Sequence, residues 1–293
     1  MGAKAGKRIN AKLRFRIVGN SGPVAQLLHP LWIPRDDIPL MGNILKAIDD
    51  EVSMLPKVRL VVSGGGFIEI CLNEHFTRKS WKSKGTLDKL TNLVSERVKP
   101  VAETLKGSMR DYVIGVDVFD KNEIGGGQFA VVLNSGEIKT VAWKSFPVLE
   151  EQNWLAGFST RKGRQSPRIV ATSLGTTMVL VCHDAQAYNH RNQALVNCAD
   201  LPTYRAHAIR EMDRVMRGSI PKWVFSLIHQ IEKEESLKSF QSSYKQIHED
   251  YKHRPTVVGS FGYGRRIQIP ERLVELAQFP RGKAKVSIIL EAI

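Results

Sequence analysis

Short β-branched runs alternate with stretches of helical periodicity along most of the chain. Apolar residues recur at helical spacing in residues 40–52, and again in residues 87–98 behind Thr86 as a plausible helix cap. Strands are predicted at residues 60–63, 68–72, 112–119, 129–133, 138–143, 169–172 and 177–181. Residues 202–217 and 236–251 are predicted to be helical, and residues 223–228, 256–261 and 286–290 to be strands.

The stretch AVVLNSGEIKTVAW predicts a β-hairpin, in which Asn134, Ser135 and Gly136 supply turn chemistry between two strands. Hairpins mixed with alternating strands and helices imply an α/β layered domain, with helices covering a buried sheet. No linker rich in Pro, Gly or Ser divides the chain. We therefore expect one domain over residues 1–293, with residues 1–11 as a flexible basic N-terminus.

The bulk properties favour a cytoplasmic protein. Apolar runs such as residues 178–181 and 286–290 are far too short to span a bilayer, so no membrane association is expected. The basic N-terminus lacks the apolar stretch of a secretory signal. The three cysteines, Cys71, Cys182 and Cys198, have no paired spacing, which indicates free thiols in a reducing compartment.

The formal net charge of +14 is the most unusual bulk property. Basic residues concentrate in residues 1–16, 77–84, 161–168 and 252–266. Such a surface attracts anions and binds nucleic acid non-specifically by counterion release. The sequence contains no helix-turn-helix, zinc-finger or RNP pattern, so a solvated basic face is favoured over a nucleic-acid partner.

The segment TTMVLVCHDAQAYNHRN carries the strongest chemical signal. An apolar strand that delivers Cys182 at its end, followed by a helix-compatible stretch, exposes a nucleophile at the edge of a sheet. A helix N-terminus favours the thiolate form of a cysteine. The alternative is an inert, buried thiol, which is common for cysteine.

His183 directly follows this cysteine, but neighbouring residues on a strand point to opposite faces. We therefore expect that His183 does not act as the base for Cys182. A metal site made of His183, Asp184 and His190 is a further possibility, but no second cluster at ligand spacing supports it. No metal is expected.

Two upstream strand ends offer partners for the thiol. Glu74 follows the strand in FIEICLNEHFTR, and Lys144 follows the strand in KTVAWKSFPVLEEQNW. Strand ends along one edge of a layered sheet can meet at one pocket. There a carboxylate takes the thiol proton, while an ammonium balances the charge that develops on the substrate. Glu69, five residues before Glu74 on the same candidate strand, is the alternative carboxylate.

The order Glu74, Lys144, Cys182 resembles the Glu-Lys-Cys triad of the nitrilase (carbon-nitrogen hydrolase) superfamily. CLNEHF is similar to the family strand that ends in Pro-Glu, with Asn73 in place of proline. LNSGEIKTVAWKSFPVLEE resembles the stretch around the family lysine, and MVLVCHDAQAY resembles the strand before the family cysteine. A Phe-Pro-Glu that follows in the family is replaced here by Ala-Tyr-Asn, ending at Asn189. The resemblance covers roughly residues 12–291.

The resemblance implies a four-layer αββα sandwich of mixed sheets covered by helices. It also implies hydrolysis of an amide, carbamoyl or nitrile carbon through a thioester on Cys182, with Glu74 as the base. Lys144 and the backbone N–H of His183 would then hold the oxyanion. Glu151, or Glu150 as the fallback, would position the substrate. The family implies no metal or organic cofactor, a small-molecule amide-type substrate and a homo-oligomer, a dimer or larger.

Two expectations concern the basic surface. Residues 160–168 are expected either to form a basic pocket mouth that favours an anionic substrate or to be a solvated loop, and the basic residues concerned are Arg161, Lys162, Arg164 and Arg168. The second functional hypothesis is a catalytically degenerate nitrilase fold that serves as a binding or regulatory module, with the basic surface engaging nucleic acid or a protein partner. The departures at Asn73 and Asn189 motivate it.

Overall fold

The computed structural model describes residues 7–10, 13–74, 84–121, 126–146, 166–188, 210 and 212–292. The helices are α1 (Ile38–Val52), α3 (Lys84–Thr104) and α5 (Glu234–Asp250), with the 3-10 helices η2 (Cys182–Tyr188) and η4 (Pro270–Ala277). The first strands are β1 (Lys7–Asn10), β2 (Leu13–Val18), β3 (Val24–Pro30), β4 (Leu60–Ser63), β5 (Ile68–Cys71), β6 (Asp111–Phe119), β7 (Gly127–Asn134) and β8 (Glu137–Trp143). The remaining strands are β9 (Ile169–Thr172), β10 (Gly175–Val181), β11 (Trp223–Ile231), β12 (Thr256–Tyr263), β13 (Gln278–Phe279) and β14 (Val286–Ala292).

The strands form two sheets that join at one corner. The continuous strand order is β8-β7-β6-β4-β3-β12-β11-β10-β9. Strands β3 and β12 pair over only two positions, Gly262 with His29 and Tyr263 with Pro30, so the chain of strands turns there from the first sheet into the second. Strands β3, β4 and β6 run parallel in the first sheet, as do β10, β11 and β12 in the second. Their carboxyl ends therefore lie at corresponding edges.

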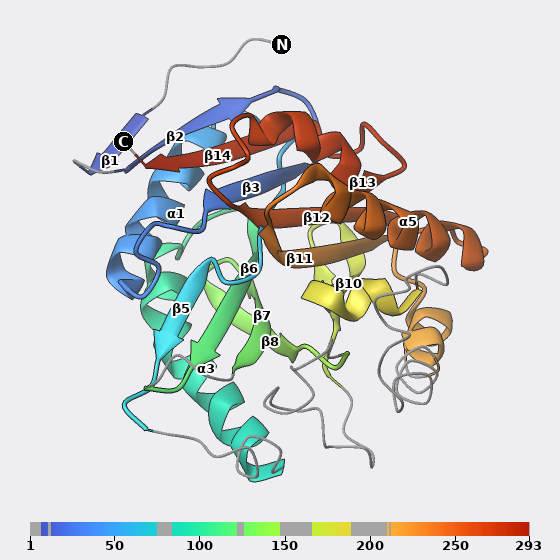
Figure 1. The fold of residues 1–293 in the computed structure, drawn as a ribbon, viewed down its shortest axis with the longest axis horizontal. Helices are drawn as coiled ribbons and strands as arrows, with labels where there is room; N and C mark the ends of the chain where they lie inside the picture. Colours follow the sequence, from blue (N-terminus) through green and yellow to red (C-terminus); the bar gives the residue numbers. More distant parts are fainter. Residues whose placement is uncertain are drawn as a thin grey trace.

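Three hydrophobic clusters define the layers. One cluster joins the buried faces of α1 and α3 to the outer face of the first sheet. A second lies between the sheets, where Val62 and Val113 belong to one sheet and Leu227 to the other. A third joins α5, η2 and η4 to the second sheet. Figure 1 shows α1 and α3 on one side of the strands and α5 on the other. The predicted αββα sandwich is confirmed.

The predicted helices and hairpin form for the expected local reasons. Asp37 caps α1 by accepting a hydrogen bond from the Leu40 N–H at 2.9 Å, and Ile44 is among the residues on the buried face. The hairpin between β7 and β8 turns at Ser135 and Gly136, with φ angles of 50° and 78°. Two left-handed residues give the turn whose twist matches the two strands.

The structure differs from the predicted elements mainly at the N-terminus. Residues 7–10, predicted to be flexible, form β1, which pairs with β2. Neither β2 nor β3 was predicted. Helix α3 begins at Lys84, before Thr86, the predicted cap. Only residues 210 and 212–217 of the predicted helix at 202–217 are described; they are helical, and the helix continues to residue 219. Among the described helices, none is long and apolar enough to cross a membrane.

The core between the sheets gives a direct test of the layered arrangement. Leu227 is fully buried in it. We expect Leu227→Ala to lower the free energy of unfolding by about 2–5 kcal/mol, because the side chain leaves a cavity that two facing sheets cannot close. Urea unfolding followed by circular dichroism measures the change. Met109→Ala, at a side chain that is 88% exposed, is the control and should cost less than about 0.5 kcal/mol. Equal losses in both variants would contradict the placement of Leu227 between the sheets.

Candidate functional site

A row of polar side chains crosses the first sheet where its apolar inner face ends. Strand pairing sets Glu69 of β5 beside Asp117 of β6, and Asp117 beside Gln128 of β7. The Lys144 N–H, directly after β8, donates to the Gln128 carbonyl at 2.9 Å. Paired residues on neighbouring strands share a face, and Val113, four residues before Asp117, faces the second sheet. The row, defined as Glu69, Asp117, Gln128 and Lys144, therefore faces the second sheet.

The second sheet presents Cys182 and His229 at the same edge. Val181, the last residue of β10, pairs with Leu227 in the parallel strand β11. Cys182 and His229 follow these two residues, so both lie at the carboxyl ends of neighbouring strands. The register of β11 shifts between Ile228 and Ile231, and such a bulge re-aims the side chain that it carries. Strand β11 packs against β6, which carries Asp117.

The backbone at Cys182 brings its sulfur close to the ring of His183. Cys182 has a φ of 48°, a left-handed conformation that is costly for a residue with a Cβ atom. As a result, Cys182 Sγ lies 3.1 Å from His183 Nδ1. The expectation that these neighbours point apart, which excluded His183 as a base, is wrong. That expectation held both an extended strand and a sharp turn to separate the two side chains, whereas the left-handed turn at Cys182 leaves them in contact.

Asp184 ties the Cys182 turn to the segment that carries Lys144. Its carboxylate is fully buried and accepts hydrogen bonds from the backbone N–H groups of Ser145 and Phe146, at 2.9 and 2.7 Å. These two residues directly follow Lys144, and Asp184 lies two residues after Cys182. Lys144 is itself fully buried. Asp184 therefore links the backbone directly after Lys144 to the turn that begins at Cys182.

Arg168 completes the Asp184 cluster. Its guanidinium Nη1 donates to Asp184 Oδ2 at 2.7 Å, and its Nη2 donates to Ser145 Oγ at 2.6 Å. Arg168 is only 2% exposed. The expectation that it contributes to a solvent-facing basic entrance is therefore wrong. Its charge is used inside the protein to balance a buried carboxylate.

The structure does not bring Glu74 to this cluster. Its carboxylate is 63% exposed and forms an ion pair at 2.6 Å with Lys89, which is 57% exposed. Within the described residues, no contact joins Glu74 to Lys144 or Cys182. Glu69, the alternative carboxylate, instead belongs to the row that contains Lys144. The role of Glu74 as a base rests on the sequence alone.

Several predicted residues lie outside the described residues. These are Glu150, Glu151, Arg161, Lys162, Arg164, Asn189, His190 and Cys198. The predictions for substrate positioning and for the basic loop therefore stay predictions. Cys71 and Cys182 are free thiols, as expected, with Cys71 exposed and Cys182 buried. Among the described residues, no three histidine, cysteine, aspartate or glutamate side chains are arranged to hold a metal ion.

Asp117 and His229 are functional candidates that the sequence analysis missed. His229 Nε2 lies 3.0 Å from Asp117 Oδ2. Burial alone would lower the pKa of His229, but the charge and hydrogen bond of Asp117 and the charge of Cys182 raise it to about 9. His229 is therefore an imidazolium at neutral pH. The available sequence signal was the inward parity of both residues: Asp117 lies four positions beyond Val113 in its strand, and His229 lies two positions beyond Leu227.

A glycine loop allows Asp117 and His229 to approach. A Cβ atom on Gly66, whose φ is +63°, would lie 2.9 Å from Asp117 Oδ2, and one on Gly65 would lie 3.0 Å from His229 Cα. The Gly65 N–H also donates to the Ile228 carbonyl at 2.9 Å, which joins the loop to β11. Any larger side chain at these positions would separate the two sheets at the site.

Arg35 and Glu69 form the far side of the site. Arg35 Nη2 lies 2.5 Å from Glu69 Oε1, and its Nη1 donates to the Gly66 carbonyl at 2.7 Å. Burial raises the pKa of Glu69, whereas the Arg35 charge lowers it and the nearby Asp117 raises it further. Glu69 is thus a carboxylate with weakened acidity and a fixed guanidinium partner.

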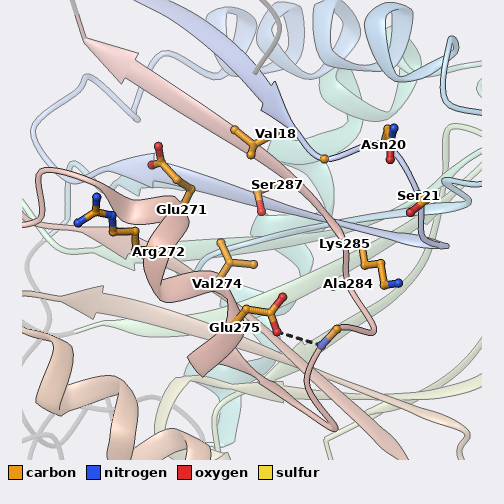
Figure 2. A pocket seen from close by; sticks show the side chains of 12 residues that line it. Val18, Asn20, Ser21, Glu271, Arg272, Val274, Glu275, Ala284, Lys285 and Ser287 are labelled. Atoms are coloured by element: carbon orange, nitrogen blue, oxygen red, sulfur yellow. Dashed lines mark hydrogen bonds between the residues drawn. The ribbon is translucent and has the colours of Figure 1, made fainter. Parts of the chain in front are cut away.

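A separate cavity of about 570 Å³ lies at the opposite edge of the sheets (Figure 2). It is lined by the end of β2, by η4 and by the chain that leads into β14. Its charged side chains include Glu271, Arg272, Glu275 and Lys285, and Glu275 accepts a hydrogen bond from the Gly282 N–H at 2.9 Å. Neither Cys182 nor any residue of the row lines it. The size of this cavity therefore does not identify it as the candidate active site.

The solved structures that resemble this chain are carbon-nitrogen hydrolases of the nitrilase superfamily and related enzymes. An amidase of this superfamily from Nesterenkonia AN1 shares 12% identity over 83% of this chain and 78% of its own, with a TM-score of 0.47. A carbon-nitrogen hydrolase from Helicobacter pylori shares 11% over 84% and 74%, with a TM-score of 0.49. Saccharomyces cerevisiae Nit3 shares 12% over 98% and 92%, with a TM-score of 0.46.

No family model and no curated protein sequence matches the chain. The structures named above belong to the superfamily that the sequence motifs resemble. Because their identities and TM-scores are low, the chemistry of the site rests on the contacts of this chain's own residues.

The Asp184 cluster can be tested against the surface pair of Glu74. We expect Asp184→Asn to lower the free energy of unfolding by about 3–5 kcal/mol, because the buried guanidinium of Arg168 loses its only charged partner among the described residues. Glu74→Gln makes the same change in an exposed pair and should cost no more than about 1 kcal/mol. Urea unfolding of both variants measures the difference. A loss for Asp184→Asn as small as that for Glu74→Gln would contradict this role of the carboxylate.

Proposed function

We propose that this protein is a hydrolase of carbon-nitrogen bonds that uses Cys182 as its nucleophile and forms a thioester intermediate. The observation that carries the proposal is the buried carboxylate of Asp184, which fixes the Cys182 turn and the Lys144 segment to each other. A thiol held in a strained turn, next to a lysine, suits nucleophilic attack on a carbonyl carbon. The approach of Cys182 Sγ to His183 Nδ1 adds a group that exchanges protons beside the sulfur.

The reaction follows from the chemistry of these groups. The thiolate attacks the carbon of an amide, carbamoyl or nitrile group, and a C–S bond forms as the electron pair moves to oxygen or nitrogen. Lys144 stabilises this developing negative charge. In the amide case the C–N bond then breaks, and the amine or ammonia leaves with the proton that the thiol gave up. A nitrile instead gives a thioimidate, which adds water and loses ammonia to reach the same thioester. Water attacks the thioester, which releases the acid and returns the thiol.

The carboxylate of the reaction is best assigned to the row rather than to Glu74. Glu69 and Asp117 share the inner face with Lys144, and both lie beside groups that move or hold protons. Activation of water for thioester hydrolysis requires a carboxylate or imidazole near the acyl carbon. The proposed mechanism therefore still uses a carboxylate, a lysine and a cysteine, but the carboxylate is Glu69 or Asp117 instead of Glu74.

The burial of the site favours a small substrate. Cys182 is 4% exposed and Lys144 is fully buried, so a side chain on a folded protein would not reach the sulfur without opening the structure. An amide-type small molecule fits this constraint. Two further expectations are part of the proposal. The homo-oligomer follows from the sequence resemblance, and the anionic substrate follows from the basic residues Arg161, Lys162 and Arg164.

The proposal is tested by release of ammonia or amine from a panel of amides, carbamoyl compounds and nitriles. We expect wild-type protein to turn over at least one class and Cys182→Ala to lose at least about 10³-fold in rate, since the nucleophile is removed. Cys71→Ala is the matched control, because Cys71 is an exposed thiol on β5, and it should keep wild-type activity. Mass spectrometry of the wild type should show an acyl group on Cys182. Full activity of Cys182→Ala would contradict the proposal.

A further inference from the structure

His229 carries a charge that the proposed reaction does not itself require. Its side chain is 25% exposed, and it lies at the same edge as Cys182. Nε2 faces the Asp117 carboxylate at 3.0 Å, and Nδ1 lies 3.3 Å from the side-chain amide of Gln128. Both ring nitrogens therefore have polar partners on the first sheet, although His229 belongs to the second.

The arrangement of Gln128 agrees with a doubly protonated ring. Its Oε1 atom is buried and has no hydrogen-bond partner when the amide nitrogen faces Nδ1. Rotation of the amide by half a turn places Oε1 against Nδ1, where it accepts a hydrogen bond from an imidazolium N–H. A protonated His229 thus satisfies both the ring and the buried oxygen.

Titratable groups from five separate segments interact electrostatically with His229. They are Asp117 on β6, Glu69 on β5, Arg35 before α1, His29 on β3 and Cys182 after β10. Burial, followed by the charges of Arg35 and His229, lowers the pKa of His29 well below its usual value, so His29 is neutral. Arg35 opposes the charge of His229, but Arg35 is itself paired with Glu69. Asp117 and a thiolate at Cys182 are the groups that favour the imidazolium.

We propose that His229, kept as an imidazolium by Asp117, is the positive charge that holds Cys182 in its thiolate form at neutral pH. Asp117 keeps the ring protonated and oriented across the gap between the sheets, and the imidazolium favours the anion on sulfur. Since the coupling between two charges is reciprocal, a thiolate also favours the protonated ring. His229 acts here as a positioning residue for the nucleophile. Its use in hydrolysis rests on the proposed function, but the thiolate itself is measurable without a substrate.

His183 has a different part in this arrangement. It is the group in direct contact with sulfur, at 3.1 Å, and its ring packs near Phe240 with centroids 5.7 Å apart. A single contact of this kind fits exchange of the thiol proton with solvent. The positive charge that favours the thiolate comes from the imidazolium of His229, because Asp117 keeps that ring protonated.

The experiment is alkylation of Cys182 by iodoacetamide between pH 5 and 10, followed by peptide mass spectrometry so that each cysteine is measured separately. The thiolate displaces iodide as a C–S bond forms and a C–I bond breaks. We expect wild-type Cys182 to react at near its maximal rate at pH 7, well below the ordinary thiol titration near pH 8.5. His229→Gln should lower the rate at pH 6.5 about tenfold, which corresponds to an upward shift of about 1.5 pH units in the thiol titration.

The pH dependence separates an electrostatic role from a structural one. Near pH 10 the ring of His229 is neutral and an uncoupled thiol is already ionised, so wild type and His229→Gln should react at similar rates. Asp117→Asn should reduce the rate at pH 6.5 as His229→Gln does. The double variant should lose little beyond either single change, since the two residues act as one unit.

His253→Gln is the matched control, because His253 lies beside Tyr251 in the chain before β12 and not at the carboxyl ends of the strands. Its alkylation profile should equal that of the wild type. The proposal is overturned if the His229→Gln profile superimposes on the wild type, or if His183→Gln shifts the profile and His229→Gln does not. Thermal unfolding of each variant establishes folding, and if Asp117→Asn does not fold, the His229→Gln profile decides the matter alone.

The two proposals fail separately. If the wild type has a thiolate that is lost in His229→Gln, but no amide is turned over, the proposed role of His229 is supported and the proposed hydrolase activity is contradicted. If turnover depends on Cys182, but the alkylation profile of His229→Gln equals that of the wild type, the proposed hydrolase activity is supported and the proposed role of His229 is contradicted.

Discussion

The arrangement of the site depends on one buried carboxylate. Asp184 receives two backbone N–H groups from the chain after β8 and a guanidinium from Arg168, and it lies within the same turn as Cys182. Buried charges are tolerated only where several hydrogen bonds replace water. Because these partners come from segments far apart in the sequence, meeting that requirement fixes the cysteine and the lysine segment relative to each other.

The position of the chemistry along the strands follows from the period of two. Strands β6 and β11 present Val113 and Leu227 to the opposite sheet, and a later inward position in each strand is polar, at Asp117 and His229. At these positions, apolar packing alone no longer fills the space between the two sheets. The polar groups instead pair across the gap, and the glycines at positions 65 and 66 leave the room for this.

The sequence predicted most of the regular elements, and the roles that it assigned to the site residues stay predictions. Most strands and helices were predicted because β-branched runs and helical spacing are local signals, as in α1 and β6. The N-terminal strands were missed because β2 alternates Leu13, Phe15 and Ile17 with arginines and β3 includes Gln26 and His29, so neither gives a long apolar run. Cys182 and Lys144 were found as polar residues directly after strands.

The sequence analysis missed Asp117 and His229 because each lies inside a strand. There the local pattern does not distinguish a polar residue of the core from a candidate functional residue. Only the pairing across two sheets shows that the carboxylate and the ring meet. The same reasoning explains Glu69 and Glu74. Both were assigned to one candidate strand. Glu69 is the second residue of β5 and lies at its inward parity, whereas Glu74 lies beyond the end of β5 and pairs with Lys89 at the surface. Parity within a paired strand, rather than proximity to its end, therefore decides which carboxylate shares the environment of the nucleophile.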